Sequence, residues 1–120
     1  ISVSELLSQP VIMREDGSGT RQMIEKHLMQ NKISPNNLRM SLVLGSTEAI
    51  KLAVEHGMGV SILSNWTVRK EVQFGTIKTN TFRDIRFTRN FNIVFHKRGA
   101  LSNTAKDFFE FLKIFPFQNI

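Results

Sequence analysis

The sequence contains no cysteine, and this absence excludes disulfide bonds and thiolate catalysis. It also lacks any apolar run approaching the roughly 20 residues of a membrane-spanning helix. Residues 1–13 carry neither the basic leader nor the cleavage-site pattern of a secretory signal. From these absences we expect a cytoplasmic protein that makes no contact with a membrane.

Residue types that build metal and catalytic sites are present but are not arranged for either role. His27, His56 and His96 lie far apart in the chain, without the spacing of a metal-ligand set. Ser18 and Ser46 lack the GxSxG pattern of a nucleophile elbow, and no histidine stands near either hydroxyl in sequence. We therefore expect no metal ion, no cofactor and no enzymatic activity.

Positive charge is in excess, because the formal net charge at pH 7 is +6. The basic residues are nevertheless scattered along the chain and form no block. Three phenylalanines alternate with three arginines within residues 82–91, a pattern shared by single-strand nucleic-acid stacking surfaces and by strands with one buried face. We favour the buried face and a solvated basic surface over direct nucleic-acid binding.

The composition that is present is that of an ordinary soluble globular domain. Its 120 residues leave room for one domain, and 41% hydrophobic with 22% charged residues is the balance of a chain with a buried core. There is no internal repeat and no low-complexity segment. The chain begins at Ile1 rather than methionine, at what reads as the approach to a strand, so we expect it to be a piece of a longer protein.

Residues 42–63 predict a compact βαβ unit, around which the rest of the chain is organised. Leu42–Leu44 is a short apolar run, Ser46 and Thr47 follow as turn and cap, and apolar side chains recur at helical spacing from Ile50. Gly57 then ends the helix, and a second apolar segment follows. This is the pattern of strand, turn, helix and strand.

Two helices are predicted to begin directly after a strand, where backbone N–H groups are unpaired at the positive end of the helix dipole. One start contains Ser46 and Thr47, and the other contains Ser18, Gly19 and Thr20. Such starts favour bound anions, although for Ser46 and Thr47 taken by themselves we favour capping without a ligand. Neither the phosphate-loop pattern nor the dinucleotide-binding glycine pattern is satisfied at the second start.

The remaining elements are predicted from periodicity and turn residues. A helical turn or loop is expected over Val3–Ser8, and a helix running to about Asn31 buries Met23, Ile24, Leu28 and Met29. Strands are expected at Val11–Met13, Met40–Leu44, Val60–Leu63 and Asn92–His96, with one or two more within Thr76–Phe87. Ser64 and Asn65 are expected to cap a short helix over Trp66–Lys70, and a final helix opened by Ser102 and ended by Pro116 carries an apolar stripe of Ala105, Phe108, Phe109, Leu112 and Phe115.

Three motifs carry a resemblance to a known family. RxDGSGTR at residues 14–21, LGSTEAIKLAVEHGMGVSILS at 44–64 and FxIVFHKRGALSNTAKDFFEFL at 91–112 together resemble the effector-binding domain of LysR-type transcriptional regulators. The resemblance implies an α/β fold: a three-layer sandwich lobe of the type II periplasmic-binding-protein kind, within an incomplete two-lobe domain. Residues from 1 to about 86 would form the second lobe, and those from about 87 to 120 a crossing strand and a terminal helix that return to the first lobe.

The same resemblance implies a function. A small, anionic effector would bind in the cleft between the lobes and control transcription, with contacts at Ser46 and Thr47 and also at Ser18, Gly19 and Thr20. The full-length protein would be a homodimer or homotetramer that reaches DNA only through an upstream winged helix. A solute-binding protein of a transport system with the same fold is the alternative, and an upstream secretion signal would distinguish it.

Two arginines stand beside the predicted site. Arg14 and Arg21 are each able to add a charge-assisted contact to an anionic ligand. The competing interpretation is a surface ion pair with Glu15 or Asp16, which we favour for both arginines.

Overall fold

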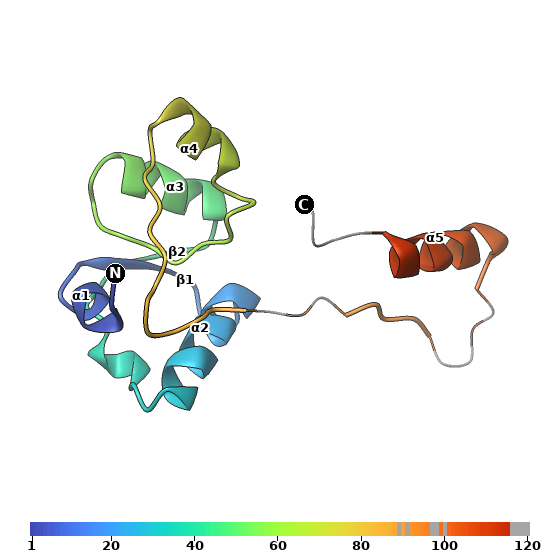
Figure 1. The fold of residues 1–120 in the computed structure, drawn as a ribbon, viewed down its shortest axis with the longest axis horizontal. Helices are drawn as coiled ribbons and strands as arrows, with labels where there is room; N and C mark the ends of the chain where they lie inside the picture. Colours follow the sequence, from blue (N-terminus) through green and yellow to red (C-terminus); the bar gives the residue numbers. More distant parts are fainter. Residues whose placement is uncertain (89, 91, 97–98, 100, 116–120) are drawn as a thin grey trace. The chain divides into compact units, whose positions relative to one another are not determined.

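The computed structural model describes residues 1–88, 90, 92–96, 99 and 101–115. The chain falls into two compact units, residues 1–89 and 90–120, drawn as a ribbon in Figure 1. The first unit carries a parallel sheet made by β1 (Val11–Arg14) and β2 (Met40–Leu44). Both strands were predicted at these positions and are confirmed, as is the α/β class. The three-layer, two-lobe architecture stays a prediction.

A third segment lies beside β1 on the edge that β2 does not use. The Val11 N–H donates to Arg39 O at 2.8 Å, whereas the Ile12 N–H donates to Val60 O at 2.8 Å. Because neighbouring residues of a strand direct their backbone groups to opposite sides, β1 lies between these two partners. The predicted third strand is reduced to a single bridge at Val60. Next to it the Ser61 hydroxyl donates to the Ile12 carbonyl at 2.8 Å.

A glycine permits the close approach of this third segment. Gly59 has φ +155°, and a Cβ built on it would lie 2.5 Å from the carbonyl oxygen of Pro10. The same oxygen accepts the Val60 N–H at 2.9 Å. Any side chain at position 59 would therefore push the segment away from β1.

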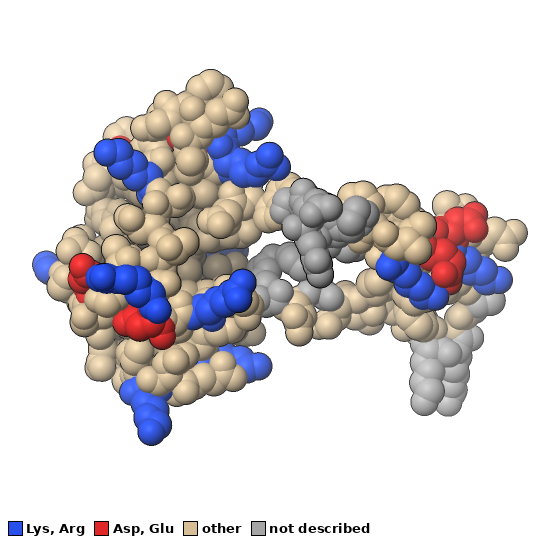
Figure 2. Space-filling view, in the orientation of Figure 1, with Lys and Arg blue, Asp and Glu red and all other residues tan. Residues whose placement is uncertain are grey.

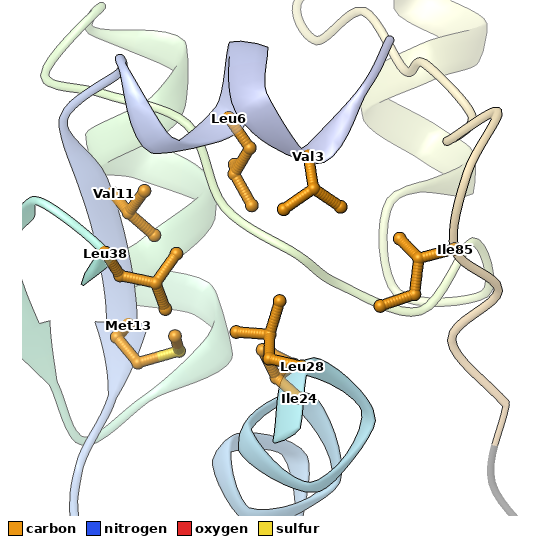
Figure 3. Packing of buried hydrophobic residues seen from close by; sticks show 8 residues of the cluster. All are labelled: Val3, Leu6, Val11, Met13, Ile24, Leu28, Leu38 and Ile85. Atoms are coloured by element: carbon orange, nitrogen blue, oxygen red, sulfur yellow. The ribbon is translucent and has the colours of Figure 1, made fainter. Parts of the chain in front are cut away.

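The side chains of β1 alternate between two hydrophobic clusters, one on each face of the strand. On one face they meet α1 (Val3–Leu7) and α2 (Gly19–Gln30), together with residues from later segments (Figure 3). Burial of each Leu or Ile side chain there stabilises the unit by about 1.5–3 kcal/mol. The eight buried members are Val3, Leu6, Val11, Met13, Ile24, Leu28, Leu38 and Ile85.

On the other face of β1, Ile12 packs against Ile50 and Ala53 of α3 (Thr47–Glu55). The i, i+3 spacing of the two α3 residues places both on the side of the helix that covers the sheet. Helices α2 and α3 therefore contact opposite faces of the same strand, and both begin just after a strand ends.

The predicted course of α2 is confirmed, since the helix ends at Gln30 with Asn31 as its C-cap. Ile24 and Leu28 are buried and Met23 is half-buried. The prediction that Met29 faces inward is wrong, because its side chain is 58% exposed. Successive residues of a helix point in different directions around its axis. On a helix that packs along one face, the residue after the buried Leu28 therefore faces solvent.

Helix α4 (Arg69–Phe74) begins three residues later than predicted. The Ser64 hydroxyl accepts the Trp66 N–H at 3.3 Å, and the Thr67 hydroxyl donates to Ser64 O at 2.8 Å, so these residues form a separate turn. The helix ends at Gly75, whose φ of +75° satisfies the left-handed C-cap.

The strands predicted within Thr76–Phe87 are wrong, since no residue of this fully described segment is in a strand. Its polar groups form hydrogen bonds with residues of helices instead. The Thr76 and Ile77 N–H groups donate to Glu71 O, and the Asp84 carboxylate accepts the Val3 N–H at 3.0 and 3.2 Å. The segment therefore runs across helix ends, where there is no neighbouring strand with which to pair.

The second unit contains α5 (Asn103–Ile114), which begins as predicted after Ser102, whose hydroxyl accepts the Ala105 N–H at 3.2 Å. The strand predicted over Asn92–His96 is wrong, because residues 92–96 make no strand pairing. The apolar stripe is only partly covered: Phe109 meets Phe95 at 6.0 Å between ring centroids, while Phe108 is 61% exposed. Pro116 and Phe91, on which further predictions rested, lie outside the described residues.

Candidate functional site

The parallel pairing of β1 and β2 brings the two predicted helix starts to one edge of the sheet. Arg14 and Leu44 are partners at the carboxyl ends of the strands, and the capping residues Ser18 and Ser46 follow within four and two residues. The Arg14 guanidinium spans the gap, because its Nη1 donates to the Thr47 hydroxyl at 3.1 Å. We call the residues Arg14, Ser18–Thr20, Ser46 and Thr47 the strand-end corner.

At the start of α3 the two hydroxyls have different roles. Ser46 is the cap: its Oγ accepts the Ala49 N–H at 3.4 Å. The capping interpretation is therefore confirmed for Ser46. Thr47 does not cap the helix but accepts a hydrogen bond from Arg14, and within residues 1–88 the N–H groups of Thr47 and Glu48 have no partner. Two donors at the positive end of the helix remain available.

At the start of α2 the cap is incomplete. Ser18 is buried, yet its side chain makes no capping hydrogen bond, and Gly17 turns the chain into the helix with φ +84°. In this part of the described chain the N–H groups of Gly19, Thr20 and Arg21 have no hydrogen-bond partner. The structure thus brings all five predicted residues to the same edge of the sheet, with open N–H groups at both starts.

Arg14 in the corner and Arg21 beside it both form ion pairs with carboxylates, as we predicted. Arg14 meets Glu15 with two contacts, Nε to Oε2 at 2.7 Å and Nη2 to Oε1 at 2.9 Å. The hydrogen bonds from Arg14 hold the pKa of Glu15 at about 2, well below its ordinary value. Arg21 pairs with Asp16 at 2.9 Å and with Glu25 at 2.7 Å, so the ion-pair interpretation is confirmed for both arginines.

A buried lysine beside the corner was missed by the sequence reasoning. Lys51 is 8% exposed and its Nζ lies 2.8 Å from Glu48 in the first turn of α3 and 2.7 Å from Glu71 on α4. Hydrogen bonds to Glu48 and then Glu71 raise the pKa of Lys51, and the bond from Lys51 lowers the pKa of Glu71. The i, i+3 spacing of Glu48 and Lys51 was a readable signal, but nothing in the sequence pointed to Glu71.

One hollow among the described residues lies away from the predicted residues. It encloses about 420 Å³ and is lined by Asn65, Val68, Arg69, Val72, Gln73, Thr79, Asn80 and Thr81. All of these except Val68 are exposed, so the hollow is a surface depression beside α4 rather than an enclosed pocket. None of the strand-end corner residues lines it.

The basic side chains form no continuous patch on the face seen in Figure 2, where blue and red groups are interspersed. Phe82 and Phe87 meet edge to face at 5.3 Å between ring centroids and pack against the first core cluster. The buried-face interpretation of these two aromatics is therefore confirmed, although they do not lie on a strand. In the described ranges no three His, Asp or Glu side chains are grouped to hold a metal ion, and no helix there could cross a membrane.

Comparison with known proteins assigns the class. Residues 1–114 match the family model of the LysR substrate binding domain, and the chain belongs to this family. The family implies a periplasmic-binding-protein-like fold, and the parallel α/β unit is consistent with it.

Several relatives are named as transcriptional regulators. The chain is 34% identical over 112 residues to the HTH-type transcriptional activator CmpR of Synechocystis, which is 93% of this chain and 36% of CmpR. It is 34% identical over 112 residues to the RuBisCO operon transcriptional regulator of Acidithiobacillus ferrooxidans, 93% of this chain and 35% of that protein. Over 111 residues it is 32% identical to the HTH-type transcriptional regulator YeiE of Escherichia coli, 92% of this chain and 37% of YeiE. The chain thus spans just over a third of the length of these relatives.

Proposed function

We propose that this chain is the ligand-sensing part of a LysR-type transcriptional regulator, in which a small anionic effector binds at the strand-end corner and controls DNA binding. Family membership over residues 1–114 and the regulator names of its relatives support the proposal. The observation that carries the site is the pair of helix starts with open N–H groups at one sheet edge, joined by the contact from Arg14 to Thr47.

The chemistry of the corner suits an oxoanion or carboxylate. The open N–H groups of Thr47, Glu48, Gly19 and Thr20 are donors at the positive ends of two helix dipoles. The Thr47 oxygen accepts from Arg14, which leaves the Thr47 hydroxyl proton to donate to a ligand oxygen. In parallel α/β folds ligands bind beyond the carboxyl ends of the strands, where this corner lies.

The larger architecture is part of the same proposal. Residues from 1 to about 86 form the second lobe of a two-lobe domain built as a three-layer sandwich, and residues from about 87 to 120 return to the first lobe. The effector is held between the lobes, so the strand-end corner is one wall of the cleft. The whole regulator acts as a homodimer or homotetramer in the cytoplasm and contacts DNA through a separate winged helix. The relatives' names favour this reading over a solute-binding protein of a transport system.

The site is tested by titrating the isotope-labelled chain with sodium sulfate at constant ionic strength and following backbone amide signals. We expect saturable shifts at Gly19, Thr20, Thr47 and Glu48. The start of α5 is the internal control, because Asn103 and Thr104 are exposed residues in the first turn of a helix. Equal shifts at Asn103 and Thr104 would show that any helix start responds and would count against the corner as a site.

A further inference from the structure

The Glu15 carboxylate contacts the Arg14 guanidinium in the way that the carboxylate of a ligand would. Its two oxygens meet Nε and Nη2 of the guanidinium at 2.7 and 2.9 Å, which is the side-on bidentate geometry that arginine makes with carboxylates. The remaining nitrogen, Nη1, donates to Thr47 at the start of α3. All three guanidinium nitrogens of Arg14 are therefore already occupied by residues of the chain itself.

We propose that the Glu15 carboxylate is an internal competitor for the effector, and that a small molecule carrying a carboxylate binds at the corner by displacing Glu15 from Arg14. This inference rests on the proposed function and names its ligand class. The ligand carboxylate would take the Nε and Nη2 positions that Glu15 now occupies.

The two partners differ in how freely they move. Arg14 has a side chain 22% exposed and is tied to a second element by its contact with Thr47. Glu15 lies in the loop after β1 with a side chain 41% exposed, so its carboxylate is able to swing into water while Arg14 keeps its position. The low pKa of Glu15, about 2, means that it is charged and competes at neutral pH.

Arg21 is a poorer candidate for the same role. Its side chain is 14% exposed and is held from two sides, by Asp16 and by Glu25 one helical turn further on. Its Nη1 also donates to Arg14 O at 3.3 Å, which fixes the end of β1. Release of one carboxylate would leave Arg21 paired with the other. Displacement of a single carboxylate therefore leaves a guanidinium without an ion-pair partner at Arg14 but not at Arg21.

An internal competitor gives selectivity. A negative charge next to two helix starts repels weakly bound anions, and only a ligand that matches the bidentate geometry and adds contacts elsewhere recovers the cost of releasing Glu15. Removal of the Glu15 charge should therefore tighten binding of simple carboxylates.

The experiment is a succinate titration of the full 120-residue chain at constant ionic strength, with Kd taken from the Thr47 and Gly19 amide signals. Succinamide, which has the same carbon chain without charge, is the ligand control. Glu15→Gln is compared with Asp16→Asn, which makes the same change of charge one residue away, on the partner of Arg21. We expect Glu15→Gln to lower the succinate Kd about threefold to tenfold, Asp16→Asn to change it by less than about twofold, and succinamide to give no corner shifts.

The double variant Arg14→Gln, Glu15→Gln should lose the tighter succinate binding expected for Glu15→Gln alone. Circular dichroism checks that each variant is folded. If Asp16→Asn lowered the succinate Kd as much as Glu15→Gln does, the effect would be explained by the change in overall charge, and the inference would be overturned. If Thr47→Val weakens succinate binding while Glu15→Gln leaves it unchanged, the inference fails and the proposed site stands. If no variant binds succinate or sulfate at the corner, both fail.

Discussion

The ammonium group of Lys51 on α3 lies 2.7 Å from the Glu71 carboxylate on α4, and this part-buried ion pair joins two helices of the first unit. Lys51 also meets Glu48 at 2.8 Å, in the turn that opens toward the strand-end corner. The second oxygen of Glu71 is buried without a hydrogen-bond partner among the described residues. Lys51 thus compensates two carboxylates, and its hydrogen bond is the largest contribution that keeps Glu71 ionised.

The first prediction concerns acid stability. Because its bond to Lys51 lowers the pKa of Glu71 below the ordinary 4.5, the pair stabilises the fold above about pH 4.5, and this contribution is lost as pH falls through the lowered pKa. The Glu71→Gln variant should lose less stability than the unmodified chain between pH 5 and pH 3. Urea unfolding at a series of pH values measures this, and parallel curves for the two proteins would contradict it.

The second prediction concerns the first hydrophobic core. Leu28 is fully buried, and Leu28→Ala should lower the free energy of unfolding by about 2–5 kcal/mol. Met29 is the matched control, because it is the next residue of the same helix and is 58% exposed. Met29→Ala should change the free energy of unfolding by less than about 0.5 kcal/mol. Equal losses in urea unfolding would mean that α2 packs with a different face.

The third prediction concerns α5. Phe108 is 61% exposed, Phe111 48% and Ile114 80%, so this helix presents apolar area that favours association. We expect the chain to form dimers or larger species as its concentration rises, and Phe108→Asp to reduce this association. Asp107→Asn, at the exposed neighbouring position, is the control. Sedimentation velocity measures the outcome, and an unmodified chain that stays monomeric at high concentration would refute the prediction.

The fourth prediction concerns DNA. The chain alone should show no sequence-specific DNA binding despite its net charge of +6, because dispersed lysines and arginines supply only the salt-dependent term. Binding to two duplexes of equal length and different sequence is compared by fluorescence anisotropy at rising salt. Discrimination between the duplexes that survives physiological salt would overturn the prediction.

The sequence alone was sufficient for the elements whose signal is local. The apolar runs of β1 and β2, the helical period of α2 and α3, and the Ser46 and Ser102 caps all depend on neighbours a few residues apart. All five proposed contact residues also lie at strand-to-helix junctions, where the chain itself defines the geometry.

The features that sequence reasoning missed depend on groups distant in the chain. The third strand is reduced to a bridge at Val60, and beside it the Ser61 hydroxyl donates to the Ile12 carbonyl, 49 residues away. The Lys51 pair with Glu71 joins residues 20 apart, and the Arg14 contact with Thr47 joins residues 33 apart. Hydroxyl and ammonium groups form such contacts with groups that only the folded structure places nearby, and no periodic pattern in the sequence predicts these partners.

The most direct test of the account compares Thr47→Val with Thr79→Val in amide-detected titrations with sulfate and succinate. Thr47 lies at the strand-end corner and Thr79 lines the exposed hollow beside α4, so the pair separates the two places where a small molecule would sit. We expect Thr47→Val to weaken binding by about 1–3 kcal/mol, because a hydrogen bond to the anion is lost, and Thr79→Val to have no effect. Unchanged affinity in a folded Thr47→Val, or a loss in Thr79→Val instead, would contradict the assignment of the strand-end corner as the effector site.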